Sequence, residues 1–196
     1  MVDVDGVLVD GRPEDGRHWL TSVEPDLGLT AEALHREFFA PYWENIVVGR
    51  AGLMEYLPNA LQTIAPHVSA AEFVSYWFQK DSRLNLPLLQ QISAVRSKGI
   101  RVYLATNQEH LRAAYLMQNL RLAAKVDGIF YSAGLGAKKP ESEFFAKVQA
   151  AVELPATQIL LLDDSPANIE AAQEAGWQAY HWTKESSPET VSSLCS

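Results

Sequence analysis

Residues 1–10 read MVDVDGVLVD and combine strand-forming valines with two closely spaced acids, Asp3 and Asp5. Val and Leu favour extended backbone, and Gly6 permits a turn directly after the second acid. We therefore expect a short strand that ends at the two carboxylates. Residues 158–164, QILLLDD, form a second stretch of this kind. Its uninterrupted apolar run is typical of a strand buried on both faces of a sheet.

From residue 87 to the C-terminus, predicted helices and strands alternate. Helices are predicted over 88–99, 109–120, 140–152 and 165–175, and strands over 100–106, 126–132, 158–163 and 177–182. The helix over 140–152 is expected to have Pro140 in its first turn, and the serine-rich tail from residue 183 is expected to fray. Repeated βα units indicate an α/β fold, a Rossmann-like parallel sheet with helices on both faces.

Residues 12–86 interrupt this alternation. Helical periodicity is evident in AEALHREFFAPYWENI (31–46), and further helices are predicted over 52–65 and 70–79, with prolines between them. No convincing strand is evident in this stretch. The sequence therefore predicts an α/β core made of residues 1–11 and 87–196, with residues 12–86 inserted as an all-helical cap.

The composition excludes several classes of protein. Of the 196 residues, 47% are hydrophobic and 20% charged, which is globular and not disordered. A net charge of −8 disfavours binding to nucleic acid or to an anionic membrane surface. Neither a membrane-length apolar run nor a secretory leader is evident, and the single cysteine, Cys195, cannot form an internal disulfide or a Cys-based zinc site. We expect a cytoplasmic protein, monomeric or homodimeric.

Polar residues follow the predicted strands at the edge where ligands of parallel sheets bind. They are Asp3, Asp5, Thr106, Asn107, Asp163 and Asp164, together with Lys139 in a loop before a helix. Two carboxylates about 4 Å apart repel by roughly 4 kcal/mol at an effective dielectric constant near 20. A hard divalent cation relieves such repulsion, and all-oxygen ligands favour Mg²⁺. The lysine is then left for a phosphoryl group, which an aspartate can attack while a second acid transfers protons.

In this order, the motifs resemble those of the haloacid dehalogenase superfamily, and the match covers nearly the whole chain. The family's first motif is matched by DVDGVLVD (3–10), its strand-ending Ser or Thr by VYLATN (102–107), its lysine by Lys139-Pro140, and its acidic pair by LLLDDSPANIEAA (160–172). Lys138 competes with Lys139 for the lysine role, and the proline that follows favours Lys139. Only Met1 and Val2 precede Asp3, fewer residues than the family's first strand has. An upstream start and a clipped chain both fit this departure, which bears on stability more than on chemistry.

The resemblance implies a role for each matched residue. Asp3 is implied as the nucleophile and a metal ligand, and Asp5 as the general acid/base, with its backbone carbonyl on the metal. Thr106 and the Asn107 amide are implied to hold phosphoryl oxygens.

Lys139 is implied to pair with the same phosphoryl oxygens. Asp164 is implied as a magnesium ligand, with Asp163 bound to the ion directly or one step removed. Within the superfamily, an aspartate at position 5 indicates phosphatases and phosphomutases.

The resemblance also implies that the cap closes over the site and selects the substrate. Trp43, Glu44, Arg50 and Trp77 are candidates to face the site, with packing or surface positions as the alternative interpretation. Arg50 is the preferred substrate-binding candidate because glycines flank it in VVGRAG (47–52).

The sequence thus predicts a magnesium-dependent phosphatase that acts on a small phosphate ester, a sugar phosphate being one candidate. A phosphomutase of the same superfamily uses the same residues and stays open. A non-catalytic phospho-switch is the alternative from another class. Response-regulator receivers place the acidic pair first, whereas here it comes last, and they lack a helical insertion.

Overall fold

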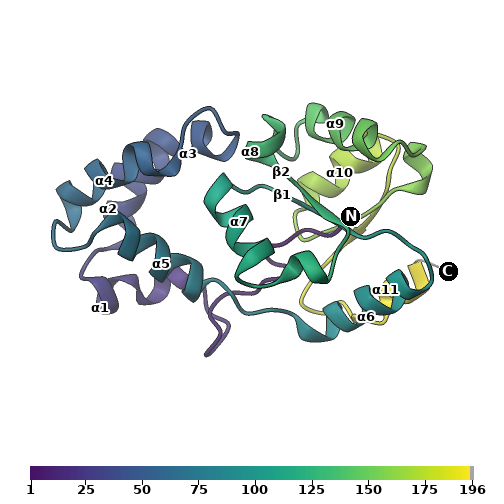
Figure 1. Ribbon diagram of the computed structural model, residues 1–196, viewed down its shortest axis with the longest axis horizontal. Coiled ribbons are helices and arrows are strands. Elements are labelled where there is room, and N and C mark those ends of the chain that lie inside the picture. The colour runs from purple at the N-terminus through teal and green to yellow at the C-terminus, as the bar shows by residue number, and fades with distance from the viewer. Residues whose placement is uncertain (195–196) are drawn as a thin grey trace.

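The computed structural model describes residues 1–194, so Cys195 lies outside the described residues. Figure 1 shows two lobes, an α/β core and a group of helices formed by the residues between about 19 and 80. This arrangement confirms the predicted fold class. No helix within residues 1–194 is long and apolar enough to cross a membrane.

The sheet of the core is parallel. β1 (Tyr103–Thr106) pairs with β2 (Gly128–Tyr131), and β3 (Leu160–Asp163) pairs with β4 (Gln178–His181). Val2 forms parallel bridges to both Leu104 and Leu162, so the first residues of the chain join the two pairs. The resulting order is β2, β1, the N-terminal segment, β3 and β4. Asp3, directly after Val2, therefore lies at the centre of the sheet's carboxyl edge.

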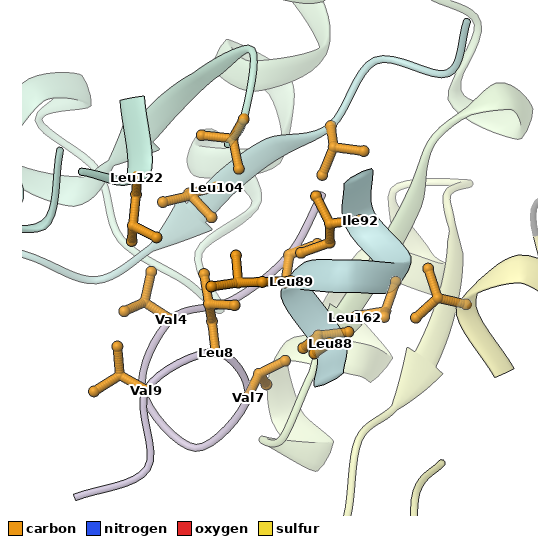
Figure 2. Packing of buried hydrophobic residues seen from close by; sticks show 14 of the residues in the cluster. Val4, Val7, Leu8, Val9, Leu88, Leu89, Ile92, Leu104, Leu122 and Leu162 are labelled. Atoms are coloured by element: carbon orange, nitrogen blue, oxygen red, sulfur yellow. The ribbon is translucent and has the colours of Figure 1, made fainter. Parts of the chain in front are cut away.

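Helices cover both faces of this sheet because successive strand residues point to opposite sides. Leu104 and Leu162 pack with α6 (Leu86–Ser97), α7 (His110–Gln118) and α11 (Thr190–Leu194) in one apolar cluster, part of which is seen in Figure 2. Ala105 and Leu161 pack with α9 (Ser142–Val152) and α10 (Pro166–Glu174) in another. The short elements η3 (Leu122–Ala124), α8 (Ser132–Leu135) and η4 (Ala156–Gln158) complete the core.

The cap consists of η1 (Trp19–Ser22), α1 (Val23–Leu27), α2 (Ala31–Leu34), η2 (His35–Phe39), α3 (Ala40–Val47), α4 (Leu53–Ile64) and α5 (Ala70–Lys80). Its side chains form an apolar cluster of their own, rich in aromatic rings. Residues 31–47 are one continuous helical run in which η2 is a π-helical turn directly before Pro41. A proline inside a helix leaves an earlier carbonyl without its donor, and a π-turn is a common accommodation.

Two linker segments join the cap to the core, and they lie side by side. The Asp10 N–H donates to the Arg83 carbonyl at 2.9 Å, and the Arg83 N–H donates to the Gly11 carbonyl at 3.0 Å. Val9 and Leu84 form an antiparallel bridge next to these bonds. The two linker segments are thus hydrogen-bonded to each other. The first of them follows Asp3 and Asp5 closely in the sequence.

Two details differ from the sequence-based expectations. The helix predicted from Pro140 begins at Ser142, with Glu141 as its N-cap, and the Lys139–Pro140 peptide bond is cis. Pro140 therefore belongs to the loop and not to the first turn. The tail expected to fray forms α11, because Val191 is buried against the core and Ser192 donates to Gln91 at 2.7 Å.

Candidate active site

The carboxyl edge of the sheet faces the cap across a cavity of about 550 Å³. Residues of both lobes line it: Asp3, Asp5, Gly6, Val9, Asp10, Gly11, Gly16, His18, Trp19, Trp43, Trp77, Asp81, Thr106, Asn107, Gln108, Arg112, Lys139, Asp164 and Asn168. The predicted core residues Asp3, Asp5, Thr106, Asn107, Lys139 and Asp164 are thus brought together in one place.

Asp3 lies at the floor of the cavity. It is 7% exposed, and its Oδ1 accepts hydrogen bonds from the Val4 N–H at 2.8 Å and lies 3.0 Å from Lys139 Nζ. Burial raises the pKa of the Asp3 carboxyl to about 7, although the Lys139 ammonium acts in the opposite direction. The Asp3 carboxylate is therefore largely shielded from solvent and lies next to the Lys139 ammonium.

Lys139 is fixed from two sides. Its Nζ donates to Asp163 Oδ2 at 2.5 Å and contacts Asp3, and it is 2% exposed. Burial alone lowers the pKa of Lys139, but these two carboxylates outweigh it and raise the pKa above its usual value. The Asn107 side chain binds the lysine main chain reciprocally, donating to its carbonyl at 2.9 Å and accepting from its N–H at 2.8 Å. Lys138 instead pairs with Glu44 of α3 at the surface.

The two aspartates after β3 have different surroundings. Asp163 is fully buried, and its carboxylate accepts hydrogen bonds from Lys139, the Ser165 N–H and Asn168. Asp164 is exposed to the cavity and lies against Gly6, where a Cβ atom would stand 2.2 Å from Asp164 Oδ2. Gly6 has φ +79°, a backbone conformation that favours glycine, and a side chain at this position would displace the Asp164 carboxylate.

An acidic cluster at this position suits a hard cation. Asp3, Asp163 and Asp164 each offer a carboxylate oxygen, and these oxygens lie within 4.8 Å of one another. Burial, followed by the Asp163 charge, raises the pKa of Asp164 although the Lys139 charge acts in the opposite direction, so Lys139 alone does not offset the electrostatic cost of the cluster. The donor set is all oxygen, which matches Mg²⁺. Asp163 is the least available of the three because its oxygens already hold Lys139 and the following loop.

Asp5 lies in the same cavity and is bound by a residue that the sequence did not indicate. Gln108 Nε2 donates to Asp5 Oδ2 at 2.6 Å, and the same nitrogen lies 3.4 Å from Thr106 Oγ1. Gln108 is 4% exposed and Thr106 is 1% exposed. Loss of bulk water raises the pKa of Asp5, and the nearby Asp81 charge adds to this effect. Gln108 therefore orients the Asp5 carboxylate in the cavity.

A second residue not predicted from the sequence joins the two lobes beside Asp5. Arg112 of α7 is 2% exposed, and its guanidinium donates to the Phe78 carbonyl at 3.2 Å and to the Asp81 carbonyl. It also lies 3.5 Å from the Asp81 carboxylate and over the rings of Phe78 and Tyr115. Arg112 appears in a helix pattern, HLRAAYL, as an ordinary polar position. Its role is evident in the structure, where it contacts the C-terminal end of α5, a helix distant in the sequence.

The cap contributes aromatic side chains to the cavity. Of the four predicted cap candidates, Trp43 and Trp77 line it, and Trp19 lies beside them. Glu44 pairs with Lys138, and Arg50 is exposed and is not among the residues that line the cavity. The predicted contact between Arg50 and substrate thus has no counterpart in this arrangement.

Comparisons with known proteins show the family of this chain. Residues 1–176 match the haloacid dehalogenase-like hydrolases. Enolase-phosphatase E1 of Pectobacterium carotovorum is 31% identical over 162 residues, covering 79% of this chain and 69% of that protein. The phosphorylated carbohydrates phosphatase of Thermotoga maritima is 24% identical over 188 residues, covering 90% of this chain and 80% of that protein. A further relative matches 45% of this chain, and the match covers only 45% of that relative's length.

A solved structure shows the same fold over almost the whole chain. It is a HAD family enzyme from Bacteroides thetaiotaomicron, solved in complex with magnesium and inorganic phosphate. The two chains superpose with a TM-score of 0.78 at 18% identity, over 95% of this chain and 94% of the other.

Proposed function

Because this chain belongs to the haloacid dehalogenase-like hydrolase family, we propose that it is a magnesium-dependent phosphatase that hydrolyses a small phosphate ester through a phosphorylated Asp3. One observation carries the proposal: the Asp3 carboxylate, 7% exposed, lies 3.0 Å from Lys139 at the floor of a cavity. A nucleophile needs a partly desolvated carboxylate, and a transferring phosphoryl group needs a fixed cation next to it. This pair supplies both.

The residues divide two steps between them. In the first, an Asp3 oxygen forms a bond to phosphorus, the bond between phosphorus and the ester oxygen breaks, and Asp5 gives a proton to the departing alcohol. In the second, Asp5 takes a proton from water, the water oxygen attacks phosphorus, and the bond to Asp3 breaks to release phosphate. Lys139 and the Thr106 hydroxyl hold the phosphoryl oxygens in both steps, and Gln108 keeps Asp5 oriented.

The acidic cluster would hold the metal. Asp3 and Asp164, with the Asp5 carbonyl, are the residues we assign to it, and Asp163 anchors Lys139 and the loop after β3. When bound, Mg²⁺ would neutralise charge on the phosphoryl group and among the carboxylates. The cap excludes bulk water from Asp3 and limits the substrate to a small molecule. A relative named as a phosphorylated carbohydrates phosphatase supports a small phosphorylated metabolite, and a relative named as an enolase-phosphatase supports phosphatase activity.

The direct test is chemical trapping of the phosphoenzyme. The protein with Mg²⁺ is mixed with a panel of phosphomonoesters, phosphate release is measured, and the acid-quenched protein is mapped by mass spectrometry. We expect phosphate on Asp3 and no turnover by Asp3→Asn. Asp26→Asn, a cap-surface substitution beside Tyr76 and Lys80, is the matched control and should retain activity. Wild-type turnover by Asp3→Asn, or phosphate on another residue, would overturn the assignment.

A further inference from the structure

We infer that the alcohol released from the substrate carries no negative charge and presents an apolar face to a tryptophan wall of the cap. We define this wall as Trp19, Trp43 and Trp77. The inference rests on the proposed phosphatase function and narrows its substrate class. Two independent features of the cavity support it, the packing of the wall and the distribution of charge.

The tryptophan wall is rigid. Trp19 and Trp77 stack with ring centroids 5.1 Å apart, and Trp43 lies 5.7 Å from Trp77. Phe39 packs edge-on against Trp43 and Trp77, so the rings are held by their neighbours. Trp19 and Trp77 are 4% and 7% exposed, whereas Trp43 is half-buried and offers the larger free surface. Such a surface binds a sugar ring, an aryl group or a branched alkyl group by its apolar face.

Charge in the cavity disfavours a second anion on the substrate. Carboxylates among the lining residues are Asp3, Asp5, Asp10, Asp81 and Asp164. The lysine and arginine side chains among those lining residues are Lys139 and Arg112. Lys139 is bound by Asp3 and Asp163, and Arg112 by Asp81 and two backbone carbonyls. His18 also lines the cavity, and its Nδ1 accepts a hydrogen bond from the Leu20 N–H. A carboxylate or second phosphate on the alcohol would therefore meet a lysine and an arginine that are already paired, and it would face like charge.

A matched pair of substrates tests the inference on the wild-type protein with Mg²⁺. Benzyl phosphate and 4-carboxybenzyl phosphate differ by one negative charge at similar leaving-group reactivity. We expect kcat/KM for benzyl phosphate to be larger by about tenfold or more.

Variants of α3 locate the effect. Trp43→Ala should lower kcat/KM for benzyl phosphate several-fold, mainly through KM, and leave a small ester such as methyl phosphate little changed. Tyr42→Ala is the control, because Tyr42 is next to Trp43 on the same helix but stacks on Tyr56, 4.4 Å away, and lies outside the cavity lining. Trp43→Arg should reduce the preference for benzyl over 4-carboxybenzyl phosphate about tenfold.

The outcomes separate this inference from the proposed function. Absence of turnover for every ester, with a folded protein, would overturn the phosphatase itself. Turnover in which the carboxylated ester equals or exceeds benzyl phosphate would overturn the substrate class alone. So would equal effects of Trp43→Ala and Tyr42→Ala. If Trp43 variants fail to fold, the wild-type pair still decides.

Discussion

The guanidinium of Arg112, on core helix α7, lies 3.5 Å from the carboxylate of Asp81, the residue that ends cap helix α5. Both residues line the cavity that contains Asp3 and Asp5. Arg112 also satisfies the backbone carbonyls of Phe78 and Asp81, which are among the last carbonyls of α5 and have no helical donor. The cap is therefore tied to the core at the edge of the cavity by one buried side chain.

Removing this side chain should destabilise the protein. Arg112→Ala leaves the Asp81 carboxylate and two carbonyls without their donor, which costs about 2–4 kcal/mol of unfolding free energy. Arg112→Lys should recover only part of the loss, because an ammonium lacks the planar fork. Urea denaturation measures both. Arg36→Ala, which removes an exposed pair with Glu37, is the control and should change stability little. A loss no larger than this control would show that the tie is unimportant.

The raised pKa of Asp3 predicts how the stability of the folded protein depends on pH. In the folded, metal-free protein the Asp3 carboxyl has a pKa of about 7 against an ordinary value of 3.8, so it keeps a proton that the unfolded chain loses. Stability therefore falls as pH rises between about 4 and 7 and levels off above 7. Asp3→Asn carries no such proton. In excess chelator, its stability relative to wild type should increase by roughly 2–3 kcal/mol from pH 5 to pH 8.

Urea denaturation of both proteins at the two pH values measures this difference. Asp5, Asp81 and Asp164 also have raised pKa values, but they are present in both proteins and cancel in the comparison to first order. A relative stability that is constant or decreases from pH 5 to pH 8 would contradict the burial of an ionisable Asp3.

The Mg²⁺ dependence of phosphate release should change when Asp164 is substituted. We expect phosphate release to stop in excess chelator and to return on addition of Mg²⁺. Asp164→Ala should raise the Mg²⁺ concentration needed for half-maximal activity and lower the maximal rate, because it removes an accessible oxygen from the cluster. Glu174→Ala, an exposed acid on α10, controls for lost charge and should leave both quantities unchanged. Full activity in chelator would exclude a metal role for the cluster.

Sequence patterns could predict the core residues of the site because strand ends converge. Asp3, Thr106 and Asp163 each follow apolar runs of a parallel sheet, and that topology alone places them at one edge. Asp81, Gln108 and Arg112 carry no comparable signal. Asp81 ends a cap helix and Arg112 lies inside a core helix, so their contact depends on how two lobes dock, which local patterns do not encode.

The loop around Arg50 also shows that local sequence patterns do not encode how the two lobes contact each other. Its flanking glycines suggest a loop that presents a side chain to a ligand. In the structure, Gly49 has φ +72°, and a Cβ atom there would lie 2.3 Å from the Ala133 carbonyl oxygen. This glycine permits the cap loop to approach α8 of the core closely. In this structure Gly49 serves a contact between the lobes, and the binding of substrate by Arg50 stays a prediction.

The last prediction concerns Gln108, whose Nε2 donates to Asp5 at 2.6 Å. Gln108→Leu keeps most of the volume and removes the donor, so the Asp5 carboxylate loses the contact that orients it toward the ester oxygen. Both steps need a proton transfer at Asp5, whereas phosphoryl binding depends on Lys139 and Thr106. We therefore expect kcat to fall about tenfold with KM little changed, a range within the usual contribution of positioned acid–base groups. Gln118→Leu, at the exposed end of α7, is the control.

An ester with a poor leaving group should show a larger loss of rate in Gln108→Leu, because its departing alcohol depends more strongly on the proton from Asp5. An ester with an acidic alcohol, such as 4-nitrophenyl phosphate, should show less loss in the first step, measured as the burst of 4-nitrophenol. Equal losses for both esters in that step would place Gln108 in the packing of the cavity wall and not in the orientation of Asp5.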